Sequence, residues 1–158
     1  MRSPKIPENE IFLKLKKKNK KLGLAESCTG GMVSGRITNV PGISAYFNGS
    51  VIAYSNEVKV SVLGVPPEKI KKYGAVSRQV ASLMAEGARR VLKTDIAAAV
   101  TGIAGPSGST PGKPVGVAYI AVSSDRSRKT KRVLFRGDRL SIRSGFCDAV
   151  LGMILDNL

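Results

Sequence analysis

The segment Ala25-Glu26-Ser27-Cys28-Thr29-Gly30-Gly31 is the part of the sequence that indicates the fold and the candidate site. It follows a short apolar run, Leu22 to Ala25, and precedes a segment from Met32 to Thr38 with helical character. This order predicts a strand, a loop and a helix, with Ser27, Cys28 and Thr29 as possible nucleophiles or polar contacts. Glycines let a ligand approach the backbone, and free N–H groups at a helix start suit a phosphate or a developing oxyanion. The alternative is that Ser27 or Thr29 only caps the helix.

Length and composition indicate one globular domain over residues 1–158, because 42% of the residues are hydrophobic and no low-complexity block interrupts the chain. The apolar runs are too short to cross a bilayer, and the N-terminal residues lack the apolar region of a signal peptide. We therefore expect a cytoplasmic protein. The two cysteines, Cys28 and Cys147, are then expected to be free thiols.

The chain contains no histidine, which excludes Ser-His-Asp and Cys-His catalysis. Two cysteines and scattered carboxylates do not make a zinc site, so we expect no metal and no cofactor. Any chemistry must use lysine, tyrosine, serine, threonine, arginine or a carboxylate.

The charge is strongly basic, with 26 Lys and Arg against 11 Asp and Glu and a formal net charge of +15. Such an excess attracts nucleic acid or a phosphorylated small molecule. The basic clusters at 14–21, 69–72 and 126–132 are not interleaved with aromatic residues as in single-strand binders. We interpret most of this charge as solvated surface. Nucleic acid is therefore not the expected partner, although the charge does not exclude it.

Hydrophobic periodicity and turn residues predict an alternation of helices and strands. The expected helices are 7–21, 32–38, a short one capped by Ser55, 66–73, 78–93 and 141–156, and the expected strands are 22–25, 50–54, 96–100, 115–123 and 131–135. Asn48-Gly49 is typical of a hairpin turn between Tyr46-Phe47 and the strand at 50–54. Gly145 inside the last helix is expected to weaken it.

Two further segments bear on chemistry. Lys59 falls near the start of the helix capped by Ser55, where the helix dipole lowers a lysine pKa, as a general base requires. The strand at 96–100 leads into Thr101-Gly102-Ile103-Ala104-Gly105-Pro106, a second glycine-rich loop. Ligands of open α/β sheets bind at the carboxyl ends of strands, so this loop and the Ser27 loop are expected to share one crevice. The polar loop at 107–114 lacks the P-loop spacing.

Seven motifs in order resemble the C-terminal domain of the competence/damage-inducible protein CinA. They are 25–31, Val40-Pro41-Gly42 with Ala45-Tyr46-Phe47, 54–59, 74–77, 101–106, 113–116 and Gly137-Asp138-Arg139. The resemblance implies a three-layer α/β/α sandwich on a mixed, about five-stranded sheet. Members of that family are similar to nicotinamide mononucleotide deamidase, so it also implies hydrolysis of this nucleotide to nicotinate mononucleotide and ammonia. A pyridine mononucleotide would then be the small-molecule partner, and self-association is common in the family.

The resemblance also assigns roles by position. Ser27 matches the nucleophile, Lys59 the general base and Tyr54 a residue that relays or orients the proton. Arg143, and less closely Arg139, matches an arginine region thought to serve the site. We expect the substrate-binding set to comprise Thr29, Gly30, Gly31, Thr101, Gly102, Gly105, Arg139 and Arg143. The alternative function is a non-catalytic basic adaptor or DNA-associated domain linked to competence or damage response.

Overall fold

The computed structural model describes residues 7–158 and builds them around one mixed five-stranded sheet in the order β2-β1-β3-β4-β5. The strands are β1 (Leu22–Glu26), β2 (Phe47–Ile52), β3 (Ile96–Gly102), β4 (Val117–Ser124) and β5 (Arg128–Leu134). The helices are α1 (Pro7–Lys18), α2 (Met32–Thr38), α3 (Asn56–Ser61), α4 (Pro67–Tyr73), α5 (Arg78–Val91) and α6 (Arg139–Asp156), with a short 3-10 turn η1 (Ile43–Ala45). Strands β2, β1 and β3 run parallel, whereas β4 and β5 are antiparallel to their neighbours.

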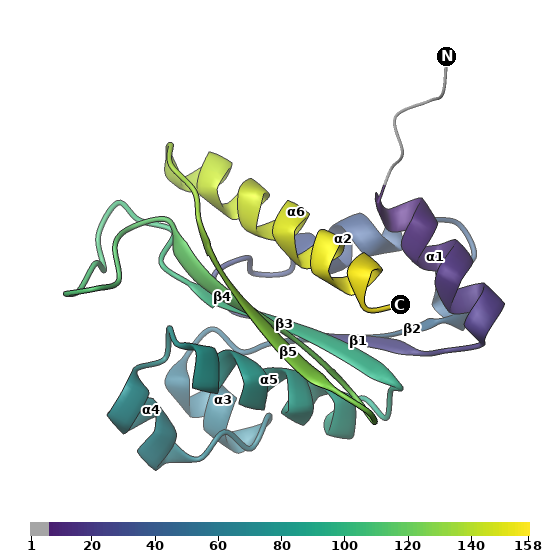
Figure 1. The fold of residues 1–158 in the computed structure, drawn as a ribbon, viewed down its shortest axis with the longest axis horizontal. Helices are drawn as coiled ribbons and strands as arrows, with labels where there is room; N and C mark the ends of the chain where they lie inside the picture. The colour runs from purple at the N-terminus through teal and green to yellow at the C-terminus, as the bar shows by residue number, and fades with distance from the viewer. Residues whose placement is uncertain (1–6) are drawn as a thin grey trace.

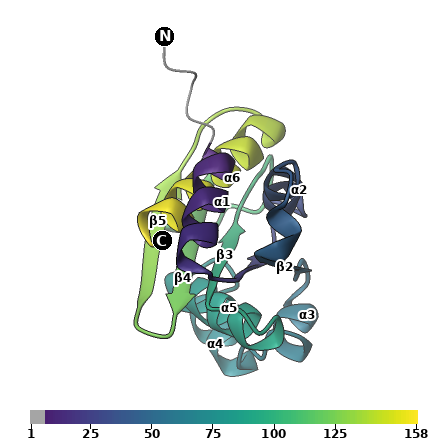
Figure 2. The ribbon, with the colours of Figure 1, turned by 90° about the vertical axis from the view of Figure 1, so that its right-hand side faces the viewer.

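Helices cover both faces of this sheet. Figures 1 and 2 show α1, α2 and α6 on one face and α3, α4 and α5 on the other. The three-layer α/β/α arrangement that the motifs predicted is confirmed.

The central strand β3 shows why the sheet is sandwiched. It is buried on both faces, as its continuous apolar sequence predicted. Ile96, Ala98 and Val100 belong to the core under α6, while Ala97 and Ala99 face α5. The small alanine side chains let α5 pack close to the sheet, and the carboxyl end of β3 is held at the centre of the molecule.

Local capping sets several helix boundaries. The Oγ atoms of Ser55 and Ser77 accept hydrogen bonds from the N–H groups of Val58 and Val80, as the sequence predicted for both serines. Helix α6 begins at Arg139, two residues before the predicted start, because Asp138 caps it by accepting from the N–H of Ser141.

The predicted hairpin at Asn48-Gly49 is wrong. Phe47 to Ile52 form the single strand β2, which pairs in parallel with β1. Its register shifts at Asn48, because Leu22 pairs with Phe47 and Gly23 with Gly49. Asn48 is therefore the extra residue of a bulge, and its side-chain amide donates to the Leu92 and Lys93 carbonyls at the end of α5, at 2.9 and 3.4 Å.

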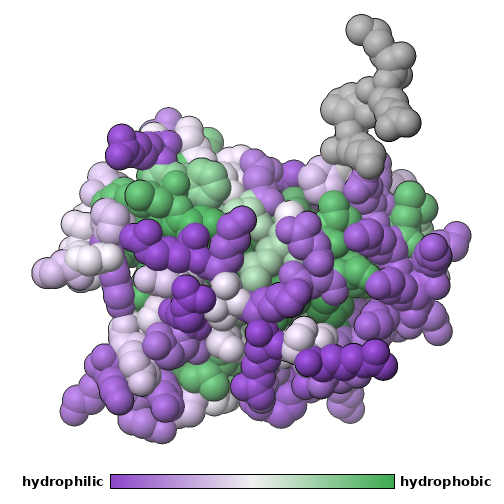
Figure 3. All heavy atoms as spheres, viewed as in Figure 1, coloured by the Kyte–Doolittle hydropathy of each residue, from purple (hydrophilic) through white to green (hydrophobic). Residues whose placement is uncertain are grey.

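The surface is largely polar. Figure 3 shows hydrophilic side chains over most of one face, interrupted by smaller hydrophobic areas. Among residues 7–158, no helix has both the length and the apolar character needed to span a membrane.

Candidate active site

A pocket of about 260 Å³ lies where the segments after β1, β2 and β3 meet. Its position at the carboxyl ends of parallel strands agrees with the predicted crevice shared by two glycine-rich loops. The residues that line it are Ser27, Cys28, Tyr54, Asn56, Lys59, Ala75, Val76, Thr101, Gly102, Ile103, Ala104, Gly105, Ser107, Gly108 and Arg139.

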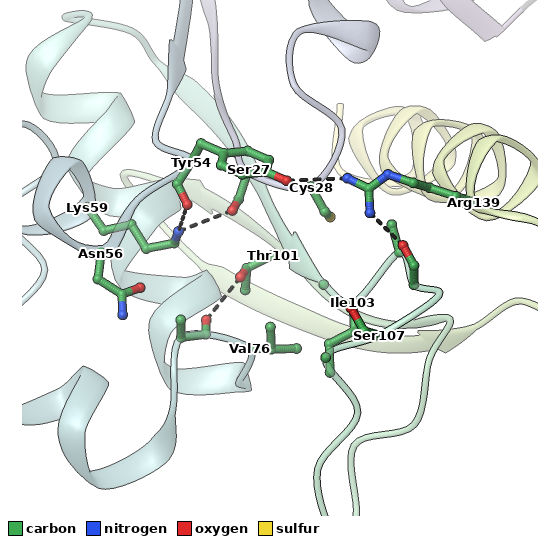
Figure 4. Close-up of a pocket in the computed structure, with 15 residues that line it drawn as sticks. Ser27, Cys28, Tyr54, Asn56, Lys59, Val76, Thr101, Ile103, Ser107 and Arg139 are labelled. Atoms are coloured by element: carbon green, nitrogen blue, oxygen red, sulfur yellow. Dashed lines mark hydrogen bonds between the residues drawn. The ribbon is translucent and has the colours of Figure 1, made fainter.

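Ser27 and Lys59 are in contact at the base of this pocket (Figure 4). Ser27 directly follows β1, and its own N–H donates to the Val100 carbonyl of β3 at 3.2 Å. Lys59 projects from α3, and its Nζ lies 3.1 Å from Ser27 Oγ. A serine and a lysine separated by 32 residues are thus brought within hydrogen-bond distance by the pairing of β1 with β2.

Burial disfavours the charged form of Lys59; the residue lies in the last turn of α3, so the predicted effect of the positive helix end does not apply. Its side chain is only 2% exposed, and burial lowers its pKa from the ordinary value of 10.5. The Nζ atom also lies 2.8 Å from the Ala53 carbonyl and 3.2 Å from the Tyr54 carbonyl. Nζ donates to Ser27 Oγ and to both carbonyls. When it loses one proton, two N–H groups remain for the carbonyls and the lone pair faces the Ser27 hydroxyl, as a general base requires.

The other nucleophile next to Ser27 is poorly suited to react. Burial raises the pKa of the Cys28 thiol to about 12, and burial raises that of Cys147 to about 11. Both cysteines are free and buried, as the sequence predicted for their oxidation state. Because the thiolate is the reactive form, Ser27 is the better candidate.

Tyr54 and Arg139 meet at the mouth of the pocket. The Tyr54 ring is 63% exposed, and its hydroxyl accepts from Arg139 Nη2 at 3.3 Å. Arg139 Nη1 also donates to the Gly105 carbonyl at 2.6 Å. Tyr54 contacts Lys59 through its backbone carbonyl, so its hydroxyl is engaged with Arg139 rather than with the lysine (Figure 4).

The loop after β3 forms another wall. Thr101 is buried, and its hydroxyl donates to the Ala75 carbonyl at 3.0 Å. Gly102 and Gly105 line the pocket as predicted, and both are in tight contact with the segment 115–118. A Cβ at Gly102 would lie 2.6 Å from Ala118 Cβ, and one at Gly105 would lie 2.4 Å from Val115 Cγ1. These glycines therefore allow close packing behind the pocket.

Glu26 organises the Ser27 turn, a role that sequence reasoning missed. Its carboxylate is 1% exposed and accepts from the N–H groups of Gly31, Val33 and Ser34 at 3.0, 3.1 and 2.9 Å. It also accepts from the hydroxyls of Thr29, Ser34 and Ser50. The start of α2 is thus occupied by a carboxylate of the protein itself, contrary to the expectation that its N–H groups bind a phosphate.

Thr29, Gly30, Gly31 and Arg143 do not line the pocket, although all four were expected to bind substrate. Thr29 is fully buried, and the N–H of Gly30 donates to the Ser27 carbonyl at 3.1 Å. Arg143 instead contacts the backbone of the Ser27 turn. Asn56, Val76 and Ser107 line the pocket without having been expected to do so. The motifs at 54–59 and 74–77 include Asn56 and Val76, whereas no motif covers Ser107.

Helix α6 remains continuous through Gly145. A Cβ at this position would lie 2.7 Å from Cδ1 of Phe135, whose ring packs edge-on against Phe146 at 5.9 Å. The glycine therefore permits close contact between α6 and the segment after β5.

Among residues 7–158, no group of three or more His, Cys, Asp or Glu side chains is arranged so that it could hold a metal ion.

The family model for the CinA C-terminal domain matches residues 5–158. The chain is 47% identical over 149 residues to a putative competence-damage inducible protein of Desulforudis audaxviator, covering 94% of this chain and 36% of that protein. It is 51% identical over 136 residues to a CinA-like protein of Thermotoga neapolitana, covering 85% and 33%. The chain thus spans about a third of the length of these relatives.

Solved structures are also similar over nearly the whole chain. A competence damage-inducible protein A from Klebsiella pneumoniae superposes with a TM-score of 0.92 at 30% identity, covering 95% of this chain and 93% of that one. A competence/damage inducible protein CihA from Agrobacterium tumefaciens superposes with a TM-score of 0.91 at 32% identity, covering 99% and 98%. The chain therefore belongs to the CinA C-terminal domain family.

Proposed function

We propose that this domain is an amidohydrolase that converts nicotinamide mononucleotide to nicotinate mononucleotide and ammonia. The observation that carries the proposal is the 3.1 Å contact between Ser27 Oγ and the buried Lys59 Nζ inside a pocket. A serine activated by a neutral lysine can cleave an amide without histidine or metal. The substrate itself is inferred from the family resemblance.

The first half of the reaction transfers the acyl group to the enzyme. Ser27 Oγ attacks the carboxamide carbon while its proton passes to Lys59 Nζ. The tetrahedral intermediate then collapses, the C–N bond breaks, and Lys59 returns the proton to the departing nitrogen as ammonia leaves. The same lysine, neutral again, takes a proton from water as the water oxygen attacks the ester carbon. The bond from that carbon to Ser27 Oγ then breaks, Lys59 returns the proton to Oγ, and the acid product loses its own proton to solvent as the carboxylate.

The oxyanion of the intermediate needs N–H donors that are not already engaged. The N–H groups of Gly30 and Gly31, which were expected to serve, already donate to the Ser27 carbonyl and to the Glu26 carboxylate. The donor to the oxyanion must therefore lie closer to Ser27. The N–H of Cys28 donates to no other residue within 7–158, and Cys28 lines the pocket. The residue after a nucleophilic serine commonly supplies this donor.

The pocket fits part of the nucleotide. Its 260 Å³ lies below the roughly 300–1,000 Å³ usual for sites that enclose a whole ligand. We infer that the carboxamide and ring enter the pocket while the ribose phosphate stays at its mouth. Exposed Arg139 lies there, and a guanidinium suits a phosphate.

Ammonia release from nicotinamide mononucleotide by the purified chain, without added metal, tests the proposal. Ser27→Ala and Lys59→Met should each lower kcat by at least about 10³-fold, since nucleophile and base act as a unit. The matched controls are Ser61→Ala and Lys71→Met, which alter exposed residues outside the pocket. Turnover by either site variant at the wild-type rate would refute the mechanism. A DNA-associated adaptor predicts instead salt-sensitive DNA binding that Ser27→Ala leaves intact.

A further inference from the structure

We propose that Arg143 is a positioning residue that fixes the Cys28–Thr29 and Thr29–Gly30 peptide groups in the turn after the nucleophile, and that it does not contact the substrate. This inference rests on the proposed function, because it concerns the oxyanion site of Ser27. It differs from the role that the resemblance implied, in which the guanidinium serves the substrate.

The contacts of Arg143 are all with the backbone of the Ser27 turn. Its Nε donates to the Cys28 carbonyl at 2.9 Å, and its Nη2 donates to the Thr29 carbonyl at 2.8 Å. The side chain is half-buried and lies outside the pocket lining. Two consecutive carbonyls are thus held by one planar guanidinium, a geometry that lysine cannot reproduce.

The bond from Arg143 to the Cys28 carbonyl and the bond from Gly30 N–H to the Ser27 carbonyl together fix the direction of the neighbouring N–H groups. In a trans peptide, the carbonyl of one residue and the N–H of the next point in opposite directions. The Cys28 carbonyl points at Arg143, so the Thr29 N–H points away from it. The Ser27 carbonyl accepts from Gly30 N–H, so the Cys28 N–H is likewise directed away from Gly30.

The other donors of the turn are already engaged. Ser27 N–H donates to Val100 O, Gly30 N–H to Ser27 O and Gly31 N–H to Glu26. Within the described part of the chain, the N–H groups of Cys28 and Thr29 donate to no other residue. Cys28 lines the pocket and Thr29 is buried outside its lining, so the Cys28 N–H, directly after the nucleophile, is the donor available to an oxyanion.

Arg143 thus acts on the oxyanion through the peptide groups. By binding the Cys28 carbonyl it fixes the peptide group next to the one that carries the Cys28 N–H, and so limits the directions in which this donor can point. An oxyanion donor that is lost costs about 10²–10³-fold in kcat. Because the effect is confined to the transition state, KM should change little.

The test compares Arg143→Met and Arg143→Lys with Arg36→Met. Arg36 pairs with Glu8 and Asp148 between helices and touches neither the turn nor the pocket, so its loss controls for weakened packing of α6. We expect kcat to fall about 10²-fold in Arg143→Met and about 10-fold in Arg143→Lys, with KM within twofold. Arg36→Met should keep the wild-type kcat while lowering the melting temperature. If Arg143→Met fails to fold, Arg143→Lys carries the comparison.

Two probes separate this role from substrate contact. Nicotinamide riboside lacks the phosphate, and it should show the same factor of loss in Arg143→Met as the mononucleotide. A loss confined to the phosphorylated substrate, a loss expressed in KM, or an unchanged kcat would each overturn the inference. The rate at which p-nitrophenyl acetate acylates Ser27 depends on the same oxyanion site, and this substrate contains no pyridine ring. If that acylation slows in Arg143→Met while wild type releases no ammonia, the inference stands and the proposed substrate falls.

Discussion

Replacing Glu26 by glutamine should destabilise the protein without changing the volume of the buried side chain. The carboxylate is 1% exposed and accepts six hydrogen bonds, from three backbone N–H groups and three hydroxyls. A glutamine amide has one oxygen and one NH₂ group, and the NH₂ cannot accept. If the oxygen keeps the contacts to Thr29, Gly31 and Val33, the NH₂ faces the N–H of Ser34.

The magnitude follows from these contacts. An unpaired buried N–H at Ser34 costs about 1–3 kcal/mol, and the remaining bonds weaken because charged acceptors contribute roughly 1 kcal/mol more per bond than neutral ones. Loss of the charge at the start of α2 costs about 0.3–1 kcal/mol. The neutral amide is easier to bury, which offsets part of this loss. We expect Glu26→Gln to lower the free energy of unfolding by about 2–4 kcal/mol, a large share of the ~5–15 kcal/mol of a typical domain.

Urea unfolding followed by circular dichroism measures the effect, with the m-value as a check that both proteins unfold alike. Glu68→Gln is the matched control, because the Glu68 carboxylate also lies at the start of a helix, in the first turn of α4, but is exposed. The control should stay within about 0.5 kcal/mol of wild type. A free energy of unfolding for Glu26→Gln within about 1 kcal/mol of wild type, at equal m, would refute the reasoning from hydrogen bonds.

Two further predictions concern pH and packing. Burial lowers the pKa of Lys59 below 10.5, and the neutral amine is the proposed base, so kcat/KM for ammonia release should rise with pH and level off before pH 10.5. The same rise in Lys59→Met would contradict this assignment. The folded protein releases that proton at a lower pH than the unfolded chain, so the free energy of unfolding should also rise between the lowered pKa and 10.5, and urea titrations of Lys59→Met should lack this rise. Gly145→Ala should destabilise by about 1–3 kcal/mol because its Cβ would meet the Phe135 ring. Gly152→Ala in the same helix meets nothing within 4 Å and should stabilise by about 0.5–1 kcal/mol; equal effects of the two in thermal unfolding would contradict the packing argument.

Elements with strong local signals could be predicted from the sequence. The buried strand at 96–100, the caps Ser55 and Ser77 and the hairpin of β4 and β5 all depend on residues close together in the chain. The predicted hairpin at Asn48-Gly49 failed because a local turn signal was outweighed by a distant partner. There the Asn48 amide binds the end of α5, and the dipeptide forms a bulge in a parallel strand.

Some residues of the candidate site could likewise be predicted from local motifs, whereas others depend on contacts between distant segments. Ser27, Lys59 and Thr101 follow from their motifs, and the structure places them around one pocket. Glu26 could not be recognised, since its partners Ser34 and Ser50 come from α2 and β2 and a strand glutamate has no local pattern that announces such contacts. The placement of Arg143 behind the turn likewise depends on how α6 packs, which the sequence alone does not determine.

The Ser27–Lys59 pair joins two parts of the sheet that differ in how firmly they are held. Ser27 follows β1, which has a paired strand on each side, whereas Lys59 and its two carbonyl partners follow β2, an edge strand with one neighbour. The last backbone hydrogen bond before the pair runs from Ala53 N–H to the Glu26 carbonyl, at 2.8 Å. Fraying of the edge strand at that point would separate base from nucleophile while the central strands stay paired. Under the proposed function, loss of activity therefore needs less free energy than global unfolding, and the pairing of the edge strand β2 determines that smaller free energy.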